Sequence, residues 1–388
     1  MECSDSWHVD ALDRKSRREP VKKRTLEIPA VCIALFAGIL ASNRLGMVQG
    51  QSQGPSLPVF EVDHAWPKVP AKWKLGDASS IAIDAQDNIW VLHRPRTLKP
   101  EQAAAPPVIV FDSAGNYVKA WGGDGDGYEW PQREHGIYID YKGFVWLGGN
   151  NCPTNGLPRV KPVADDQLLK FTQDGKFVMQ IGHSNQSNGN ADTQNLHRPA
   201  DEWVYPQTNE LFVADGYGNH RVAVFDAESG KFKRMWGAFG NKPVDDDHCA
   251  IVTPSSFSDP GPQQFSIVHA IRVAKDGIVY VADREYRRVQ MFTKDGKFLK
   301  QLVRNNEPFA RDLALSPDAN QQFLYVGGGS GIFIVDRKTL EIVGNIEPPG
   351  IIGPGHEIAT DSKGNLYIAQ TTAGLQKLTF KRMSTANR

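Results

Sequence analysis

Three histidines occupy the same position in a repeated sequence unit and could together bind a metal ion. They are His135 in EHGIYID, His269 in VHAIRVA and His356 in GHEIATD, carried by the second, fourth and sixth of six units. If the six units close into a ring, the three imidazoles lie a third of a turn apart around one axis. Three converging imidazoles form a metal site that keeps a coordination position open for water or substrate. A lone histidine at a strand start is more often a capping residue, but three at equivalent positions favour a metalloenzyme.

Other polar side chains are expected beside the histidines, because the first strand of each unit starts where the second one ends. Arg94 in HRP and Arg284 in DREYRR could hold a carboxylate by paired hydrogen bonds. Tyr217 in DGYGN could act as a base. Neutral imidazole suits zinc, which would polarise a substrate oxygen or lower the pKa of a bound hydroxyl.

The repeated unit is typical of four short antiparallel strands. Apolar residues alternate in HGIYIDYKG (135–143) and FVWLG (144–148), and an Asp-Gly turn divides LLKFTQDGKFVMQIG (168–182). Six such units at a spacing of roughly 40–50 residues predict an all-β, six-bladed β-propeller, with a β-sandwich as the alternative. The sixth unit stops after its third strand, LQKLTF (375–380), so PVFEVD (58–63) is expected to supply the fourth strand and close the ring.

Charge and the N-terminal segment limit the partners and the location. Lys plus Arg and Asp plus Glu both number 44, and no basic stripe is interleaved with aromatic residues, so nucleic-acid binding is not expected. Residues 1–54 resemble an export signal and a flexible linker, with a basic stretch (14–24) before an apolar run (28–42). That run is shorter than the roughly 20 residues of a spanning helix, so a cleaved signal is favoured over an uncleaved membrane anchor.

Residues 55–388 are then expected to form one exported propeller domain, periplasmic or secreted, and to act as a monomer. A domain of this length exceeds one ordinary core, but each blade of a propeller packs mainly on its neighbours. Cys152 and Cys249 both fall in predicted loops, so one disulfide between them could form in an oxidising compartment.

The sequence resembles the peptidyl-α-hydroxyglycine α-amidating lyase family from about residue 59 to residue 380. The motifs that carry the resemblance are DGYGNHRVAVFD (215–226), VHAIRVAKDGIVYVADREYRR (268–288) and GHEIATDSKGNLYIAQ (355–370). NHL-type propellers share the general blade pattern. The resemblance implies an NHL-like six-bladed propeller that cleaves a C-terminal α-hydroxyglycine into a peptide amide and glyoxylate. It assigns a catalytic zinc to His135, His269 and His356, the catalytic tyrosine to Tyr217, and the substrate-binding arginines to Arg94 and Arg284.

The resemblance also implies a structural calcium, at a position where this chain departs from the family. The family's calcium carboxylate is an Asp directly after the third histidine, and here that residue is Glu357. The backbone carbonyls would come from Ile81 and Ile137. Glu is one methylene longer than Asp, so calcium binding is left open. The family's Met-Pro before that histidine is replaced by Pro354-Gly355, so the pocket wall there must differ.

We therefore expect an exported, metal-dependent carbon–nitrogen lyase that acts on a small-molecule or peptide substrate with a terminal carboxylate. One alternative is a metal-dependent lactone or ester hydrolase on the same fold. Such sites usually hold calcium through carboxylates, which three histidines disfavour. The other alternative is a non-catalytic NHL-type binding module, which predicts that no metal copurifies with the protein.

Overall fold

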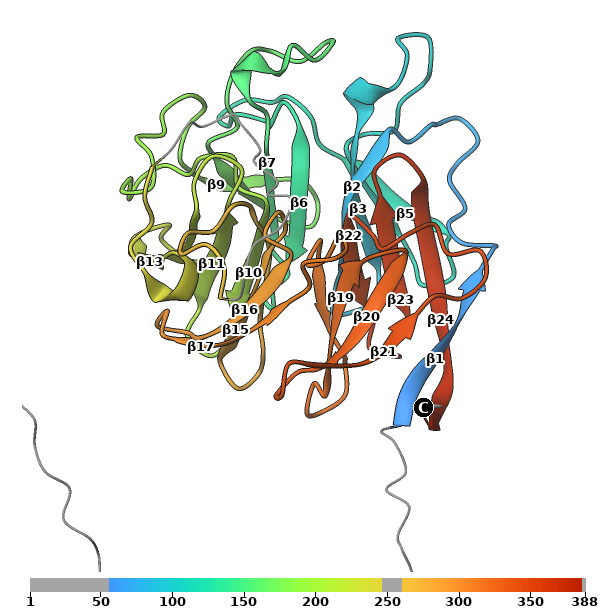
Figure 1. Cartoon of the computed structure of the whole chain (residues 1–388). Helices are drawn as coiled ribbons and strands as arrows, with labels where there is room; N and C mark the ends of the chain where they lie inside the picture. The colour runs from blue at the N-terminus through green and yellow to red at the C-terminus, as the bar shows by residue number, and fades with distance from the viewer. Residues whose placement is uncertain (1–55, 246–259, 386–388) are drawn as a thin grey trace, which may run out of the picture. The chain divides into compact units, whose positions relative to one another are not determined.

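The computed structural model describes residues 56–245 and 260–385, which form six four-stranded antiparallel sheets (Figure 1). The strands of blades one to three are β2 (Asp77–Ile83), β3 (Ile89–Arg94), β4 (Val108–Phe111), β5 (Tyr117–Trp121), β6 (Glu134–Ile139), β7 (Val145–Gly149), β8 (Leu168–Phe171), β9 (Phe177–Ile181), β10 (Asp201–Tyr205), β11 (Glu210–Asp215), β12 (Arg221–Asp226) and β13 (Phe232–Trp236). Those of blades four to six are β14 (Val268–Val273), β15 (Ile278–Asp283), β16 (Arg288–Thr293), β17 (Phe298–Val303), β18 (Leu313–Leu315), β19 (Phe323–Gly328), β20 (Gly331–Asp336), β21 (Glu341–Ile346), β22 (Glu357–Thr360), β23 (Leu366–Gln370), β24 (Gly374–Thr385) and β1 (Ser56–Asp63).

The first strands of the blades contact one another in a closed ring, β2–β6–β10–β14–β18–β22 and back to β2. Helical structure in the described ranges is limited to the 3-10 turns η1 (Pro95–Thr97), η2 (Pro153–Asn155) and η3 (Ala238–Gly240). The prediction of an all-β, six-bladed β-propeller is therefore confirmed. The ring places the start of every first strand around the central axis, which is where the sequence puts the histidines.

The recurring Asp-x-x-Gly turn fixes the hairpin between the first two strands of a blade. Asp140 Oδ1 accepts hydrogen bonds from the backbone N–H groups of Lys142 and Phe144, both at 2.9 Å. Its Oδ2 accepts from the indole N–H of the fully buried Trp146 at 3.0 Å. Gly143 has φ +84°, a conformation that costs glycine least. The turn therefore ties the hairpin register to a core side chain.

The hydrophobic core lies between blades rather than at one centre. Phe212 and Trp236 of blade three, for example, pack in one buried cluster with Ile271 and Val281 of blade four. Each blade thus buries its faces against its neighbours, so the core grows with the number of blades.

The ring is closed by the N-terminal strand, as predicted from the missing strand of the sixth unit. Strand β1 pairs antiparallel with β24 from Ser56 opposite Thr385 to Asp63 opposite Lys377, and in Figure 1 the blue β1 lies along the red β24. Phe60 in β1 is buried, with its ring centre 6.3 Å from that of Tyr325 and 6.1 Å from that of Phe380.

Several sequence predictions fall outside the described ranges. The proposed leader, residues 1–54, is one of them. Cys249 is another, so its pairing stays a prediction, although Cys152 is buried and disulfide-bonded. Within the described ranges, no helix is long and apolar enough to cross a membrane.

Shortening the side chain of Phe60 should destabilise the whole ring, because it removes apolar contacts at the seam where the first and the last of the described strands complete one blade. We expect Phe60→Ala to lower the free energy of unfolding by about 3–4 kcal/mol in denaturant titrations. Val118→Ala, on the exposed face of β5, is the matched control and should change it by about 0.5 kcal/mol or less. Equal effects of the two substitutions would contradict the role given to the closing strand.

Candidate functional site

The structure brings the three histidines together at the axis. His135 and His269 lie on β6 and β14, and His356 directly precedes β22. Their ring centres are 4.6–5.0 Å apart, and one nitrogen of each lies within 4.8 Å of those of the other two. Ligand atoms at these separations can surround one metal ion.

Each histidine is oriented by a backbone carbonyl of the next blade. The three Nδ1 atoms bond to carbonyl oxygens in or just before the first strands of the odd blades: His135 to Ala200 at 2.7 Å, His269 to Arg311 at 2.5 Å, and His356 to Ser79 at 2.6 Å. Because a carbonyl oxygen only accepts, each Nδ1 carries the proton and each Nε2 has a lone pair that can accept. This arrangement fixes the tautomer that a metal ligand requires.

The surroundings keep the imidazoles neutral. Burial lowers the pKa of all three well below the usual value, and nearby imidazoles and arginines, including Arg94 and Arg284, lower it further. The Nε2 atom of His269 is buried without a hydrogen-bond partner among the described residues. A metal ion would satisfy that lone pair, so the residues present fit zinc bound by three histidines with one coordination position open.

Tyr217 joins the histidine cluster to Arg284. Its hydroxyl, on the loop after β11, donates to Nε2 of His135 at 3.0 Å and accepts from Nη1 of Arg284 at 2.8 Å. Arg284 also bonds to the carboxylate of Glu285 at 2.7 Å. Burial lowers the pKa of Arg284, but Tyr217 and Glu285 more than offset this and raise it overall. The tyrosine oxygen therefore lies between a metal ligand and a permanent positive charge.

Two buried ion pairs hold the loops that carry Tyr217 and Arg284. Asp215 pairs with Arg221 at 2.8 Å, and Asp283 pairs with Arg288 at 2.9 Å, all four side chains being fully buried. The second oxygen of each aspartate accepts a backbone N–H from a neighbouring loop. The aspartates that end the second strands of blades three and four are therefore supports for the site rather than members of it.

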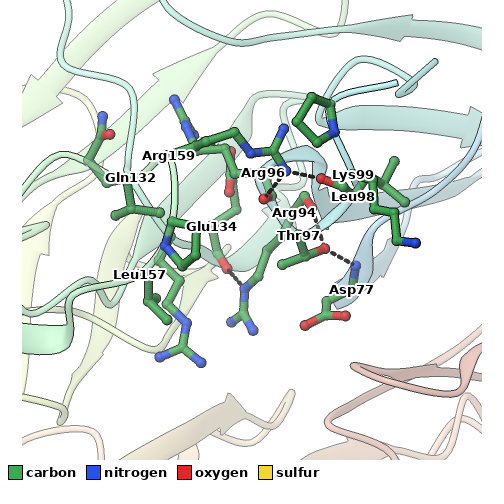
Figure 2. Close-up of a pocket in the computed structure, with 14 residues that line it drawn as sticks. Asp77, Arg94, Arg96, Thr97, Leu98, Lys99, Gln132, Glu134, Leu157 and Arg159 are labelled. Carbon is green, nitrogen blue, oxygen red and sulfur yellow. Dashed lines mark hydrogen bonds and ion pairs between the residues drawn. The ribbon is translucent and has the colours of Figure 1, made fainter. Parts of the chain in front are cut away.

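Arg94 ends β3 and is almost completely buried. Its Nε donates to the carbonyl of Glu134 at 2.7 Å (Figure 2), but within the described ranges it forms no ion pair. Burial, and next the charge of Arg133, lower its pKa to about 10. A carboxylate bound here would offset both the burial of the Arg94 charge and its repulsion by Arg133. Arg94 lines a cavity of 460 Å³, whereas Arg284 and Arg311 line a second cavity of 370 Å³ together with His269 and His356.

Arg133 is a site residue that the repeat pattern does not reveal. Its charge acts on both Arg94 and His356, and it lines the larger cavity. It lies two residues before His135, in a loop outside the alternating strand pattern. Only its proximity in sequence to a histidine ligand could have indicated it.

The residues implied for calcium meet in the central channel, but around an arginine. Glu357 lies with Asp201 and Asp312. Ile81 and Ile137 line a cavity of 380 Å³ together with Asp201 and Arg272. The guanidinium of Arg272 contacts Asp201 and lies 3.3 Å from Asp312 and 3.7 Å from Glu357. Because a cation already lies among these carboxylates, the set does not fit a calcium ion at this place.

Fold and site together define a six-bladed β-propeller whose axis carries a three-histidine cluster. The chain is similar to peptidyl-glycine alpha-amidating monooxygenase B of Xenopus laevis, at 26% identity over 349 residues, which covers 81% of this chain and 35% of the relative. It is also similar to the amidating monooxygenase of Mus musculus, at 28% identity over 365 residues, or 84% of this chain and 33% of the relative. The chain thus spans about a third of the length of these relatives.

Two other kinds of relative were found. A probable peptidyl-alpha-hydroxyglycine alpha-amidating lyase of Caenorhabditis elegans is 28% identical over 161 residues, covering 41% of this chain and 36% of the relative. NHL repeat-containing protein 3 of Mus musculus is 24% identical over 244 residues, covering 61% of this chain and 58% of the relative. No family model matches the chain. The resemblance to amidating lyases and to NHL-type propellers is confirmed by these relatives.

Removing one imidazole should empty the metal centre. We expect purified wild-type protein to bind zinc, and His269→Ala to bind it at least about 100-fold more weakly, because only two ligands remain. Zinc content after dialysis and competition with a chromogenic chelator measure this. His183→Ala removes an exposed histidine elsewhere and is the matched control. Unchanged zinc affinity in His269→Ala would exclude the histidines as the metal site.

Proposed function

We propose that the protein is a zinc-dependent carbon–nitrogen lyase that converts an acyl-NH–CH(OH)–COO⁻ substrate into a primary amide and glyoxylate. The observation that carries the proposal is the contact of Tyr217 with both His135 and Arg284, beside a second buried arginine, Arg94, that forms no ion pair with the residues the structure describes. The relatives named as amidating lyase and amidating monooxygenases support the same chemistry.

The two arginines would hold the carboxylate of the substrate. Arg94 and Arg284 are permanent cations whose planar donors match a carboxylate, and both lie within electrostatic reach of the histidines. Binding the carboxylate between them places the adjacent α-hydroxyl near the three Nε2 atoms. Zinc held by these nitrogens would supply a Lewis acid that favours ionisation of that hydroxyl.

Tyr217 would move the proton. Its oxygen lies 3.0 Å from His135 Nε2, within reach of a hydroxyl bound at the histidines, and Arg284 stabilises negative charge on it. The ionised Tyr217 oxygen takes the hydroxyl proton from the substrate, the C–O bond becomes a carbonyl, and the C–N bond breaks with its electron pair on nitrogen. The amide nitrogen then takes a proton, so the products are an amide and glyoxylate, and no oxidant is needed.

Location, assembly and substrate size belong to the same proposal. The basic stretch followed by an apolar run at residues 14–42 supports export. The proposal covers both a cleaved signal and an uncleaved membrane anchor. We propose a monomer, since the blades described here already close on one another. The acyl part of the substrate could belong to a small molecule or to a peptide.

Glyoxylate release from α-hydroxyhippurate tests the reaction. The full chain should release glyoxylate, lose this activity with a chelator and regain it with zinc. Tyr217→Phe should lower kcat by about 10²–10⁴-fold while zinc content stays unchanged, since only the proton-transfer group is removed. Tyr141→Phe, at an exposed tyrosine, is the matched control.

No release from zinc-loaded wild-type protein would reject the lyase. Hydrolysis of lactones or esters by the same preparation would then favour the hydrolase alternative. Absence of zinc and of every activity would favour a binding module, to which the similarity with NHL repeat-containing protein 3 points.

A further inference from the structure

The cavity beside Arg94 carries more positive charge than one substrate carboxylate can balance. We infer that the acyl group of the substrate bears a second carboxylate, held in this cavity by Arg133 and Lys99. The inference rests on the proposed lyase function and names the class of substrate within it.

Cationic side chains dominate the cavity. Its volume is 460 Å³, and its charged lining consists of Arg94, Arg96, Lys99, Arg133 and Arg159 against Asp77 and Glu134. Five cations and two acids leave a net charge of +3. One carboxylate of an α-hydroxyglycine would still leave +2 within a single hollow.

The excess lies on particular side chains. Arg96 pairs with Glu134 at 3.2 Å, and the guanidinium of Arg159 bonds to the backbone carbonyls of Arg96 and Leu98 (Figure 2). Within the described ranges, the side chains of Arg133 and Lys99 form no ion pair or hydrogen bond. These two cations are therefore available to a ligand, beyond the carboxylate that Arg94 would bind.

The loop that carries Arg133 is fixed rather than free. The buried carboxylate of Asp165 accepts the backbone N–H groups of Gln132 at 2.7 Å, Arg133 at 2.9 Å and Asn151 at 2.8 Å. Burial raises the pKa of Asp165 to about 6, although these three bonds oppose it. The backbone that carries Arg133 is thus positioned before a ligand arrives, which lowers the entropic cost of binding there.

The apolar lining of the cavity indicates which part of the substrate lies between its two carboxylates. The apolar residues of the cavity are Leu98, Pro100, Leu157, Pro158 and Val160. An acyl chain with an apolar body and a terminal carboxylate matches this combination. A dicarboxylic acyl group or an acidic peptide residue next to the hydroxyglycine has that chemistry.

Two matched substrates test the inference: N-glutaryl-α-hydroxyglycine and the same compound with its distal carboxylate converted to a carboxamide. We expect wild-type kcat/KM to favour the acid by about tenfold or more, and this ratio to fall as salt is added. Arg133→Gln and Lys99→Gln should each lower the ratio toward one. Arg382→Gln, at an exposed arginine on β24, should leave it unchanged.

Binding of inert analogues separates this inference from the lyase itself. N-glutarylglycine and its carboxamide lack the α-hydroxyl, so calorimetry reports their affinity without turnover. A wild-type preference for the acid that is lost in Arg133→Gln supports the inference even if no glyoxylate is released. Equal affinity for acid and carboxamide, with glyoxylate still released from α-hydroxyhippurate, would overturn the inference and leave the lyase standing.

A second observation, in the central channel, carries an independent inference. We propose that the guanidinium of Arg272 replaces the structural calcium that the resemblance to amidating lyases implies. Arg272 lies on β14 of blade four and bridges Asp201 of blade three, Asp312 of blade five and Glu357 of blade six. One side chain thereby joins four blades at the axis, as a shared divalent ion would.

The acids around Arg272 also bind backbone. Asp201 accepts the N–H of Ile271 at 2.9 Å, and Asp312 accepts the N–H of Ile358 at 2.5 Å. Burial lowers the pKa of Arg272, but the three carboxylates outweigh it and raise the value overall. A calcium ion added here would meet a buried positive charge at contact distance, which disfavours it.

Calcium content and thermal unfolding of the zinc-loaded full chain test this proposal. Wild-type protein dialysed against calcium should retain no stoichiometric calcium, and calcium should not change its Tm. Arg272→Met should lower Tm by about 5–10 °C and regain part of it in millimolar calcium, because the acids then lack a cation. Arg272→Lys keeps the positive charge, so its Tm should lie between those of wild-type protein and Arg272→Met. Wild-type protein that retains one calcium per chain, and loses Tm when the calcium is removed, would overturn the proposal.

Discussion

The structure depends on a single linkage, repeated three times, between blades of even and odd number. Each even blade reaches forward with a histidine Nδ1 to a carbonyl of the next odd blade. It reaches back with the N–H of the isoleucine two residues later, which bonds to a side chain of the preceding odd blade: Ile137 to Ser80, Ile271 to Asp201 and Ile358 to Asp312. The bonds that hold the ring together at its axis therefore also orient the three imidazoles. At these positions one side chain serves the ring through its Nδ1 and offers its Nε2 to a metal, so a substitution would affect both.

Charge is sorted along the axis although the whole chain has a formal net charge of zero. Arginines gather around the histidines, where burial keeps the imidazoles neutral, the positive charges reinforce this, and an anion would be attracted. Carboxylates gather around Arg272, where burial raises the pKa of Asp312 to about 7. The arginines around the histidines suit the recognition of a carboxylate substrate. The carboxylates around Arg272 form a buried structural ion cluster with it. The overall composition conceals this division, because positive and negative side chains are equal in number over the whole chain.

The fold and the histidine cluster could be predicted from sequence because both are periodic. Short alternating strands recur with the same turn, and the histidines recur with them. Residues at equivalent positions of the repeat therefore lie at equivalent places around the ring. Arg272 could not be placed in this way, since HAIRVAKDG reads as an ordinary alternating strand followed by a polar turn. Its partners Asp201, Asp312 and Glu357 lie on three other blades, at sequence separations that no local pattern reports. Arg133 escaped for a related reason: it lies in the loop before β6, outside the strand pattern, and the groups its charge acts on, Arg94 and His356, belong to other blades.

The pairing of β1 with β24 also has a kinetic consequence. The strand that completes the last blade is the first part of the propeller to leave the ribosome or a translocation channel, and its partner is the last. Until β24 emerges, the apolar face of β1 has no blade to cover, and blade six cannot form. Blades one to five can assemble as they appear, but the ring can close only when the whole chain is out. The axis, with its three histidines contributed by blades two, four and six, is therefore completed late, because His356 belongs to the blade that forms last and a chain that ends before it carries only two of the three imidazoles.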